Sequence, residues 1–341
     1  MHSNIKNVFA TIVERIRTLR HIDLVQMFRC QAASTLLFGA ITIFLAAQWS
    51  SIQHLPSAAF HERRAFATYF SPGIIRGRNS DLEFDAVRNL VYQVLHQPST
   101  RTRQNTSMLV LISPDVSDQQ RKLLEIEGAE IVTIQPSSIH RATNNADSQD
   151  SLIALRLLEL TQYDRILFLQ PYLLLTKTLD MIWEEHAASR VQLTRKNSHV
   201  NQSREVSAPE NYLFASVPSR HGKTFSSGFW VVQPDRQLYR YYISLMKLDD
   251  GTDNQSAELH GILNHAHRKE GNMPWTQLSS AKWHSDVSTR QDLLPDCATV
   301  YNNFWLLHNP SSVNKGFMDL WWKTQGYMKA YWKERSQTSK L

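Results

Sequence analysis

This sequence has few cysteines and only a small excess of charge of one sign. The 341 residues include two cysteines, Cys30 and Cys297, too few for a disulfide-stapled scaffold or a cysteine-rich zinc site. Lys and Arg number 37 against 31 Asp and Glu, and no block of basic residues marks a surface for nucleic acid. Because 42% of the residues are hydrophobic and 20% are charged, the composition excludes a disordered chain and predicts a substantial core.

Long apolar runs are also scarce, and a single one stands apart. Residues 32–49 (AASTLLFGAITIFLAAQW) carry no charge. As a helix they would span about 27 Å, which is enough for the hydrocarbon core of a bilayer. Residues 1–31 contain five Lys and Arg, whereas neither residue occurs between the run and Arg63. The positive-inside rule therefore places residues 1–31 in the cytosol.

On this interpretation the chain is a single-pass type II protein of the Golgi or endoplasmic reticulum membrane. Its predicted parts are a cytosolic tail at 1–31, a transmembrane helix at 32–49, a stem at 50–64 and a lumenal domain at 65–335. Two other interpretations of the run stay open: a cleaved signal peptide, whose apolar centre is usually shorter, and a buried core helix. The two cysteines would lie on opposite sides of the membrane and could not pair.

Three Asn-x-Ser/Thr sequons support the lumenal placement. They begin at Asn105, Asn201 and Asn254, all beyond the apolar run. A lumenal domain would expose these asparagines to N-glycosylation.

Helical and extended patterns alternate from residue 64 onward. Amphipathic periodicity predicts helices at 85–97, 117–128 and 151–161, and apolar runs predict strands at 64–69, 107–113, 129–134, 165–169, 211–217 and 229–233. Such alternation favours an α/β domain with a largely parallel sheet. Near the C-terminus, aromatic residues at helical spacing (Phe317, Trp321, Tyr331, Trp332) predict a helix that packs back on the domain.

Several segments resemble the glycogenin-like glycosyltransferases of family 8. They are LVYQVLH (90–96), LVLISPDVS (109–117), LTQYDRILFL (160–169), FSSGFWVVQP (225–234) and LNHAHRKEGNMPW (263–275). The resemblance covers about residues 65–335 and implies a GT-A fold with a Rossmann-like mixed sheet. It also implies retaining transfer of a hexose from a UDP-type nucleotide sugar to a glycan or protein acceptor, with Mn²⁺ as cofactor.

The family's metal motif, Asp-x-Asp, falls on Gln170, Pro171 and Tyr172. On an extended strand alternate residues point the same way, so two carboxylates could grip one hard cation. Neither carboxylate is present here. An amide oxygen at Gln170 would coordinate weakly, and a neutral tyrosine is a poor ligand for Mn²⁺.

Other positions that the resemblance assigns to the site also depart from the family. A donor-contacting lysine falls at Ala154, the asparagine of Phe-Asn-x-Gly falls at Ser226, and the acidic-Gln pair falls at Leu259 and His260. The late metal-binding histidine falls at Asn302, with His308 as a weak alternative. The resemblance also places Thr68 and Tyr69 where the family cradles the nucleotide base, and Lys315 near the donor.

The missing carboxylates predict that metal-dependent catalysis is weakened or lost. Two alternatives stay open: an active, metal-independent transferase that uses basic side chains (Lys177, Lys223, Lys315), or a non-catalytic partner of an active homologue that binds glycan or nucleotide sugar. Because LNHAHRKE has a helical pattern, His265 and His267 should diverge rather than hold a metal together.

Overall fold

The computed structural model describes residues 14–15, 62–72, 80–135, 152–192, 207–219, 224–248, 259–286, 296–302, 304 and 314–338. The chain divides into two units, Met1–His61 and Glu62–Leu341. Several predictions lie outside the described residues: the apolar run at 32–49, the stem at 50–61, the sequons at Asn201 and Asn254, Lys223 and His308. Among the helices that are described, none combines the length and apolar character needed to cross a membrane.

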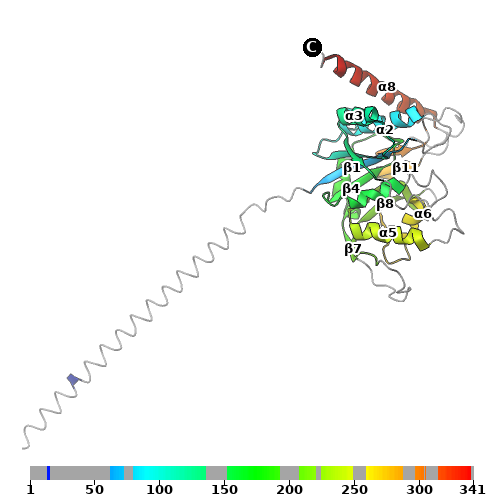
Figure 1. The fold of residues 1–341 in the computed structure, drawn as a ribbon. Helices are drawn as coiled ribbons and strands as arrows, with labels where there is room; N and C mark the ends of the chain where they lie inside the picture. Colours follow the sequence, from blue (N-terminus) through cyan, green and yellow to red (C-terminus); the bar gives the residue numbers. More distant parts are fainter. Residues whose placement is uncertain are drawn as a thin grey trace, which may run out of the picture. The chain divides into compact units, whose positions relative to one another are not determined.

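A seven-stranded mixed sheet forms the centre of the second unit (Figure 1). Its order is β10 (Thr276–Gln277), β8 (Phe214–Pro218), β9 (Phe225–Val232), β4 (Arg165–Leu169), β1 (Arg64–Phe70), β2 (Ser107–Ile112) and β3 (Glu130–Thr133). Strands β4, β1, β2 and β3 run parallel, whereas β9 pairs antiparallel with both β4 and β8. Strands β10 and β8 also pair parallel, so antiparallel pairing is limited to the two sides of β9 and the sheet as a whole is mixed.

Helices cover both faces of this sheet (Figure 1). One face carries α2 (Ser80–Leu95) and α3 (Asp118–Ile126), and α8 (Lys315–Thr338) packs against α2. The other face carries the 3₁₀ helix η2 (Leu152–Glu159), α5 (Arg236–Leu248) and α6 (Leu259–Ala266). Strand β1 serves both layers because its side chains alternate: Ala67 and Tyr69 join the second layer, and Phe66 and Phe70 the first.

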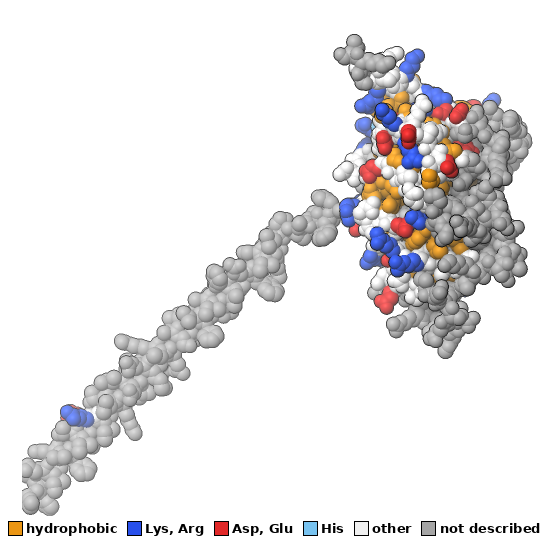
Figure 2. Space-filling model, viewed as in Figure 1, with side chains coloured by type: hydrophobic (Ala, Val, Ile, Leu, Met, Phe, Trp, Pro, Cys, Tyr) orange, Lys and Arg blue, Asp and Glu red, His pale blue; other side chains and the backbone are white. Residues whose placement is uncertain are grey.

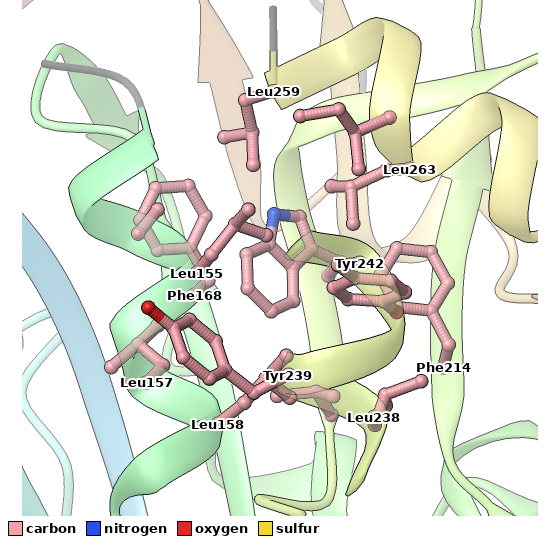
Figure 3. Packing of buried hydrophobic residues seen from close by; sticks show 14 of the residues in the cluster. Leu155, Leu157, Leu158, Phe168, Phe214, Leu238, Tyr239, Tyr242, Leu259 and Leu263 are labelled. Carbon is pink, nitrogen blue, oxygen red and sulfur yellow. The ribbon is translucent and has the colours of Figure 1, made fainter. Parts of the chain in front are cut away.

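Figure 3 shows the core under η2, α5 and α6. Leucines of η2 and Leu238 of α5 pack with Phe168 of β4 and Phe214 of β8. Within this cluster Phe168 stacks on Trp230 with ring centroids 4.8 Å apart. The predicted helix at 151–161 is therefore present as a 3₁₀ helix whose apolar residues all find partners in the core.

A second, three-stranded sheet has the order β11 (His284–Asp286), β12 (Thr299–Tyr301), β5 (Leu173–Leu175). Its edge strand β5 follows β4 after a short turn, so this small sheet lies beside the carboxyl end of β4. The remaining short elements are η3 (Asp180–Glu184), η4 (His186–Ala188), β6 (Val191–Gln192), β7 (Asn211–Tyr212) and α7 (Ser280–Trp283).

The helix boundaries follow local chemistry. The hydroxyl of Ser117 accepts the N–H of Gln120, and the Gln120 side chain returns a bond to the N–H of Ser117, so a capping box starts α3. Gly128 ends that region with φ +96°, a conformation that residues with a Cβ rarely adopt. Both features agree with the helix predicted over 117–128.

The interface between α2 and α8 buries an amide that finds no partner. Asp85 of α2 accepts a hydrogen bond from Gln325 at 3.1 Å and pairs with Lys329 at 2.8 Å, both from α8. One turn along α2, Asn89 is 0% exposed, and neither atom of its amide has a hydrogen-bond partner. An unsatisfied buried amide costs about 1–3 kcal/mol.

Replacing this amide should therefore stabilise the protein. We expect Asn89→Leu to raise the free energy of unfolding by about 1 kcal/mol, measured by urea unfolding, because a near-isosteric apolar group removes the unpaired atoms. Asn89→Asp is the matched control and should lose stability, since it buries a charge at the same place. A destabilised Asn89→Leu variant would contradict the view that the amide is unpaired.

Candidate functional site

The connection order of the sheet defines where a ligand could bind. From β1 the chain continues to β2 and β3 on one side, whereas β4 lies on the other side of β1. In open α/β sheets ligands bind beyond the carboxyl ends of the strands at such a switch point. The residues directly after these two strands, Ser71 and Gln170, therefore mark the candidate site.

Gln170 is fixed against the neighbouring strand and the small sheet. Its backbone N–H donates to the carbonyl of Gly228 at 2.9 Å, and its side-chain Nε2 lies 3.4 Å from the hydroxyl of Tyr301. A Cβ at position 228 would lie 2.4 Å from the Gln170 Oε1. The glycine in FSSGFW thus leaves room for the Gln170 amide, a contact that the sequence did not predict.

Tyr172 lies in a different environment from Gln170. It is 6% exposed and belongs to a core cluster with Cys297, Phe304 and Trp321 of α8. Residues 171 and 172 form a turn, closed by the N–H of Leu173 donating to the carbonyl of Gln170 at 3.3 Å. Gln170 and Tyr172 therefore do not point the same way from one extended strand, as the sequence predicted, because β4 ends at Leu169.

These residues do not fit a two-carboxylate metal clamp. The Gln170 side chain packs against Gly228 and donates to the hydroxyl of Tyr301, and Tyr172 is enclosed in the core. Within the described ranges no three His, Cys, Asp or Glu side chains come together as a metal site. Burial also raises the pKa of the nearby Cys297 thiol, so the thiolate that binds metals is disfavoured.

A chain of buried hydroxyls and one imidazole lies behind Gly228. The Thr299 hydroxyl donates to the carbonyl of Trp283 at 2.9 Å and lies 2.9 Å from Nδ1 of His284. Because its proton is used in that bond, the Thr299 hydroxyl oxygen accepts from Nδ1–H of His284. The unprotonated Nε2 of His284 then accepts from the Ser226 hydroxyl at 3.2 Å. Ser226, at the position of the family's asparagine, also accepts the N–H of Gly228 at 3.4 Å.

This chain joins three strands, β9, β11 and β12, at the edge of the site. His284 is buried and stacks on Phe229 with a centroid distance of 5.2 Å. Sequence reasoning did not assign a role to His284 or Thr299, because residues 58 and 15 positions apart give no local signal. The arrangement fixes the backbone around Gly228, and through it the position of Gln170.

The residues predicted to cradle a base lie inside the core. Thr68 is fully buried with no hydrogen-bond partner for its hydroxyl, and Tyr69 stacks on Phe168 at 6.1 Å. Neither side chain is accessible to a ligand in this structure.

The other predicted site residues lie on several elements of the fold. Ala154 and Leu259 are buried in the cluster under α5 and α6, while His260 is exposed with its ring 6.3 Å from that of Phe225. Lys177 pairs with Asp296 at 2.5 Å, and Lys315 is exposed at the first residue of α8.

His265 and His267 diverge, as the helical pattern predicts. His265 is exposed on α6, whereas His267 is buried just after the helix. The ring of His267 donates from Nδ1 to the carbonyl of Met273 at 2.8 Å and accepts from the hydroxyl of Tyr242. Burial lowers the pKa of His267 to about 3, so the ring is neutral and acts as a structural bridge.

No family model matches the chain. Two uncharacterized proteins of Schizosaccharomyces pombe are similar in sequence. The alignment with the first is 21% identical and spans 83% of this chain and 85% of the relative. The alignment with the second is 22% identical and spans 67% of this chain and 69% of the relative. The structure is similar to the glycosyltransferase GlyE of Streptococcus pneumoniae, with 15% identity, a TM-score of 0.49, and coverage of 80% of this chain and 65% of GlyE. It is also similar to mouse xyloside xylosyltransferase 1, with 11% identity, a TM-score of 0.42 and coverage of 71% and 98%.

Proposed function

We propose that this chain is a glycosyltransferase-like protein of the secretory pathway that binds a nucleotide sugar beyond the carboxyl ends of β1 and β4. The observation that carries the proposal is Gln170, the residue directly after β4, which stands in place of a metal-binding carboxylate beside Gly228 and Tyr301. The family resemblance of residues 65–335 and the switch point between β1 and β4 support the substrate class.

The same residues argue that transfer is weakened. Breaking the bond between sugar and diphosphate develops negative charge on the leaving group, and stabilising that charge is the main task of such a site. Gln170 and Tyr301 supply hydrogen bonds but no positive charge. The described residues at this edge of the sheet therefore favour binding over turnover.

The metal-independent alternative would need basic side chains at the same place. Lys177 is half-exposed and already pairs with Asp296. Lys315 begins α8, where the side chain of Asn314 accepts the N–H groups of Gly316 and Phe317 and so occupies the helix N-terminus. Neither arrangement favours recruitment of these two lysines to a diphosphate, whereas Lys223 lies outside the described residues. The described residues thus support the binding function better.

Thermal unfolding of the full chain with UDP-sugars tests the proposal. We expect a rise in melting temperature of the same size in excess Mn²⁺ and in excess chelator, because no metal clamp is available to strengthen binding. Gln170→Ala should reduce the shift, while Lys177→Ala, away from Gln170, should not. A shift seen only with Mn²⁺ would show that a metal site exists, and hydrolysis of the donor above background would show that catalysis persists.

A further inference from the structure

We propose that Asn105 is an N-glycosylation site, located at the end of the central sheet opposite the candidate site. The sequon Asn105-Thr106-Ser107 has no proline at its middle position. Asn105 is exposed in the connection between α2 and β2, where the N–H of Thr106 donates to the carbonyl of Gln104 at 2.9 Å and closes a bend. The acceptor amide therefore stands on the surface of the folded domain.

The loop that carries Asn105 is fixed by hydrogen bonds to Asp180. Asp180 accepts the hydroxyl of Thr102 at 2.6 Å and the backbone N–H of Arg103 at 2.9 Å. The side chain of Gln104 lies 3.4 Å from the carbonyl of Asp180. These bonds use the residues before Asn105, so a glycan can be attached without breaking them.

The location separates the glycan from the candidate site. Ser107 begins β2, which runs parallel to β1 and β4, so Asn105 lies at the amino ends of these strands. Six residues of strand span roughly 20 Å. Gln170 follows the carboxyl end of β4, and a glycan at Asn105 therefore leaves that edge open.

The modification needs a lipid-pyrophosphate-linked oligosaccharide as donor. The side-chain nitrogen of Asn105 forms a bond to the anomeric carbon of the oligosaccharide, the bond from that carbon to the phosphate oxygen breaks, and the amide loses one proton. The lipid pyrophosphate is the leaving group. Because this reaction occurs in the secretory pathway, an occupied Asn105 also requires that the domain has crossed the membrane.

The test is the full chain expressed in eukaryotic cells with Asn201→Gln and Asn254→Gln in the background, treated with a peptide N-glycosidase. We expect a single step of increased gel mobility on treatment. Asn105→Gln and Ser107→Ala should each abolish that step, and Arg103→Ala, an exposed neighbour outside the sequon, should retain it. The Ser107 hydroxyl donates to Glu130 at an exposed position, so its loss should hardly change the melting temperature.

Two results would overturn the proposal: no glycosidase-sensitive step in the background variant, or a step that survives in Ser107→Ala. Neither result bears on nucleotide binding, because the UDP-sugar shift in melting temperature is measured separately. We expect that shift to be equal before and after glycan removal.

Discussion

Tyr172→Asp, which would restore half of the missing Asp-x-Asp motif, should cost at least about 4 kcal/mol of unfolding free energy rather than restore metal binding. Tyr172 is almost fully buried among Phe304, Phe317 and Trp321. A carboxylate there would lose the contacts of the aromatic ring and would bury a charge in an apolar cluster. Urea unfolding of the full chain, followed by tryptophan fluorescence, measures the change.

Two matched variants isolate the cause. Tyr172→Phe keeps the ring and should lose no more than about 1 kcal/mol, whereas Gln170→Asp changes a half-buried side chain at the end of a strand and should also stay within about 1 kcal/mol. If Tyr172→Asp unfolded at the wild-type urea concentration, position 172 could not be part of the core. The outcome matters for function because it decides whether the clamp can be rebuilt by two substitutions.

The second large effect is expected at His267. His267→Ala should reduce the free energy of unfolding by about 4 kcal/mol, because it leaves the Tyr242 hydroxyl and the Met273 carbonyl buried without a partner and opens a cavity. The ring also stacks on Phe214 with centroids 4.1 Å apart. His265→Ala, on the exposed side of α6, is the control and should be nearly neutral.

His267 also predicts a pH dependence of stability. Its pKa is lowered by burial from 6.5 to about 3, so below pH 6.5 the unfolded chain binds a proton that the folded chain does not. The stabilisation is complete above pH 6.5 and is lost as the pH falls toward 3. Between pH 7 and pH 5 the loss is about 2 kcal/mol.

The variant His267→Phe separates the loss of stability caused by His267 from the loss caused by protonation of carboxylates. It retains an aromatic ring but cannot titrate, so its stability should fall less steeply than that of the wild type over the same pH range. Equal slopes for the two proteins would mean that folding does not lower the pKa of His267.

Much of the fold could be predicted from periodicity and caps. The apolar runs that became β1, β2 and β4, and the aromatic spacing of α8, are strong local signals. The strand predicted at 229–233 begins earlier, at Phe225, because Phe225 pairs with Pro218 beyond a register shift in the β8–β9 ladder. Short polar strands lack the pattern on which such predictions depend.

The sequence was enough to propose the position of the candidate site, but it did not predict the packing of the residues there. That the clamp carboxylates are missing is readable from Gln170 and Tyr172 themselves. Tyr172 packs against α8, a helix about 150 residues later in the chain. Gly228 lies against Gln170 because β4 and β9 pair. Such contacts between distant segments are set by tertiary packing, which local patterns do not encode.

Gln93 of α2 joins that helix to β5 of the small sheet. Strand β5 is an edge strand, and its outward backbone groups are bound by a side chain: the N–H of Leu175 donates to the Gln93 Oε1 at 2.8 Å, and the Gln93 Nε2 donates to the carbonyl of Leu173 at 3.3 Å. A single amide thus takes the place of a neighbouring strand. The three leucines of β5 are buried and α2 packs on this strand, so Gln93 removes the cost of leaving two backbone groups unpaired in the core.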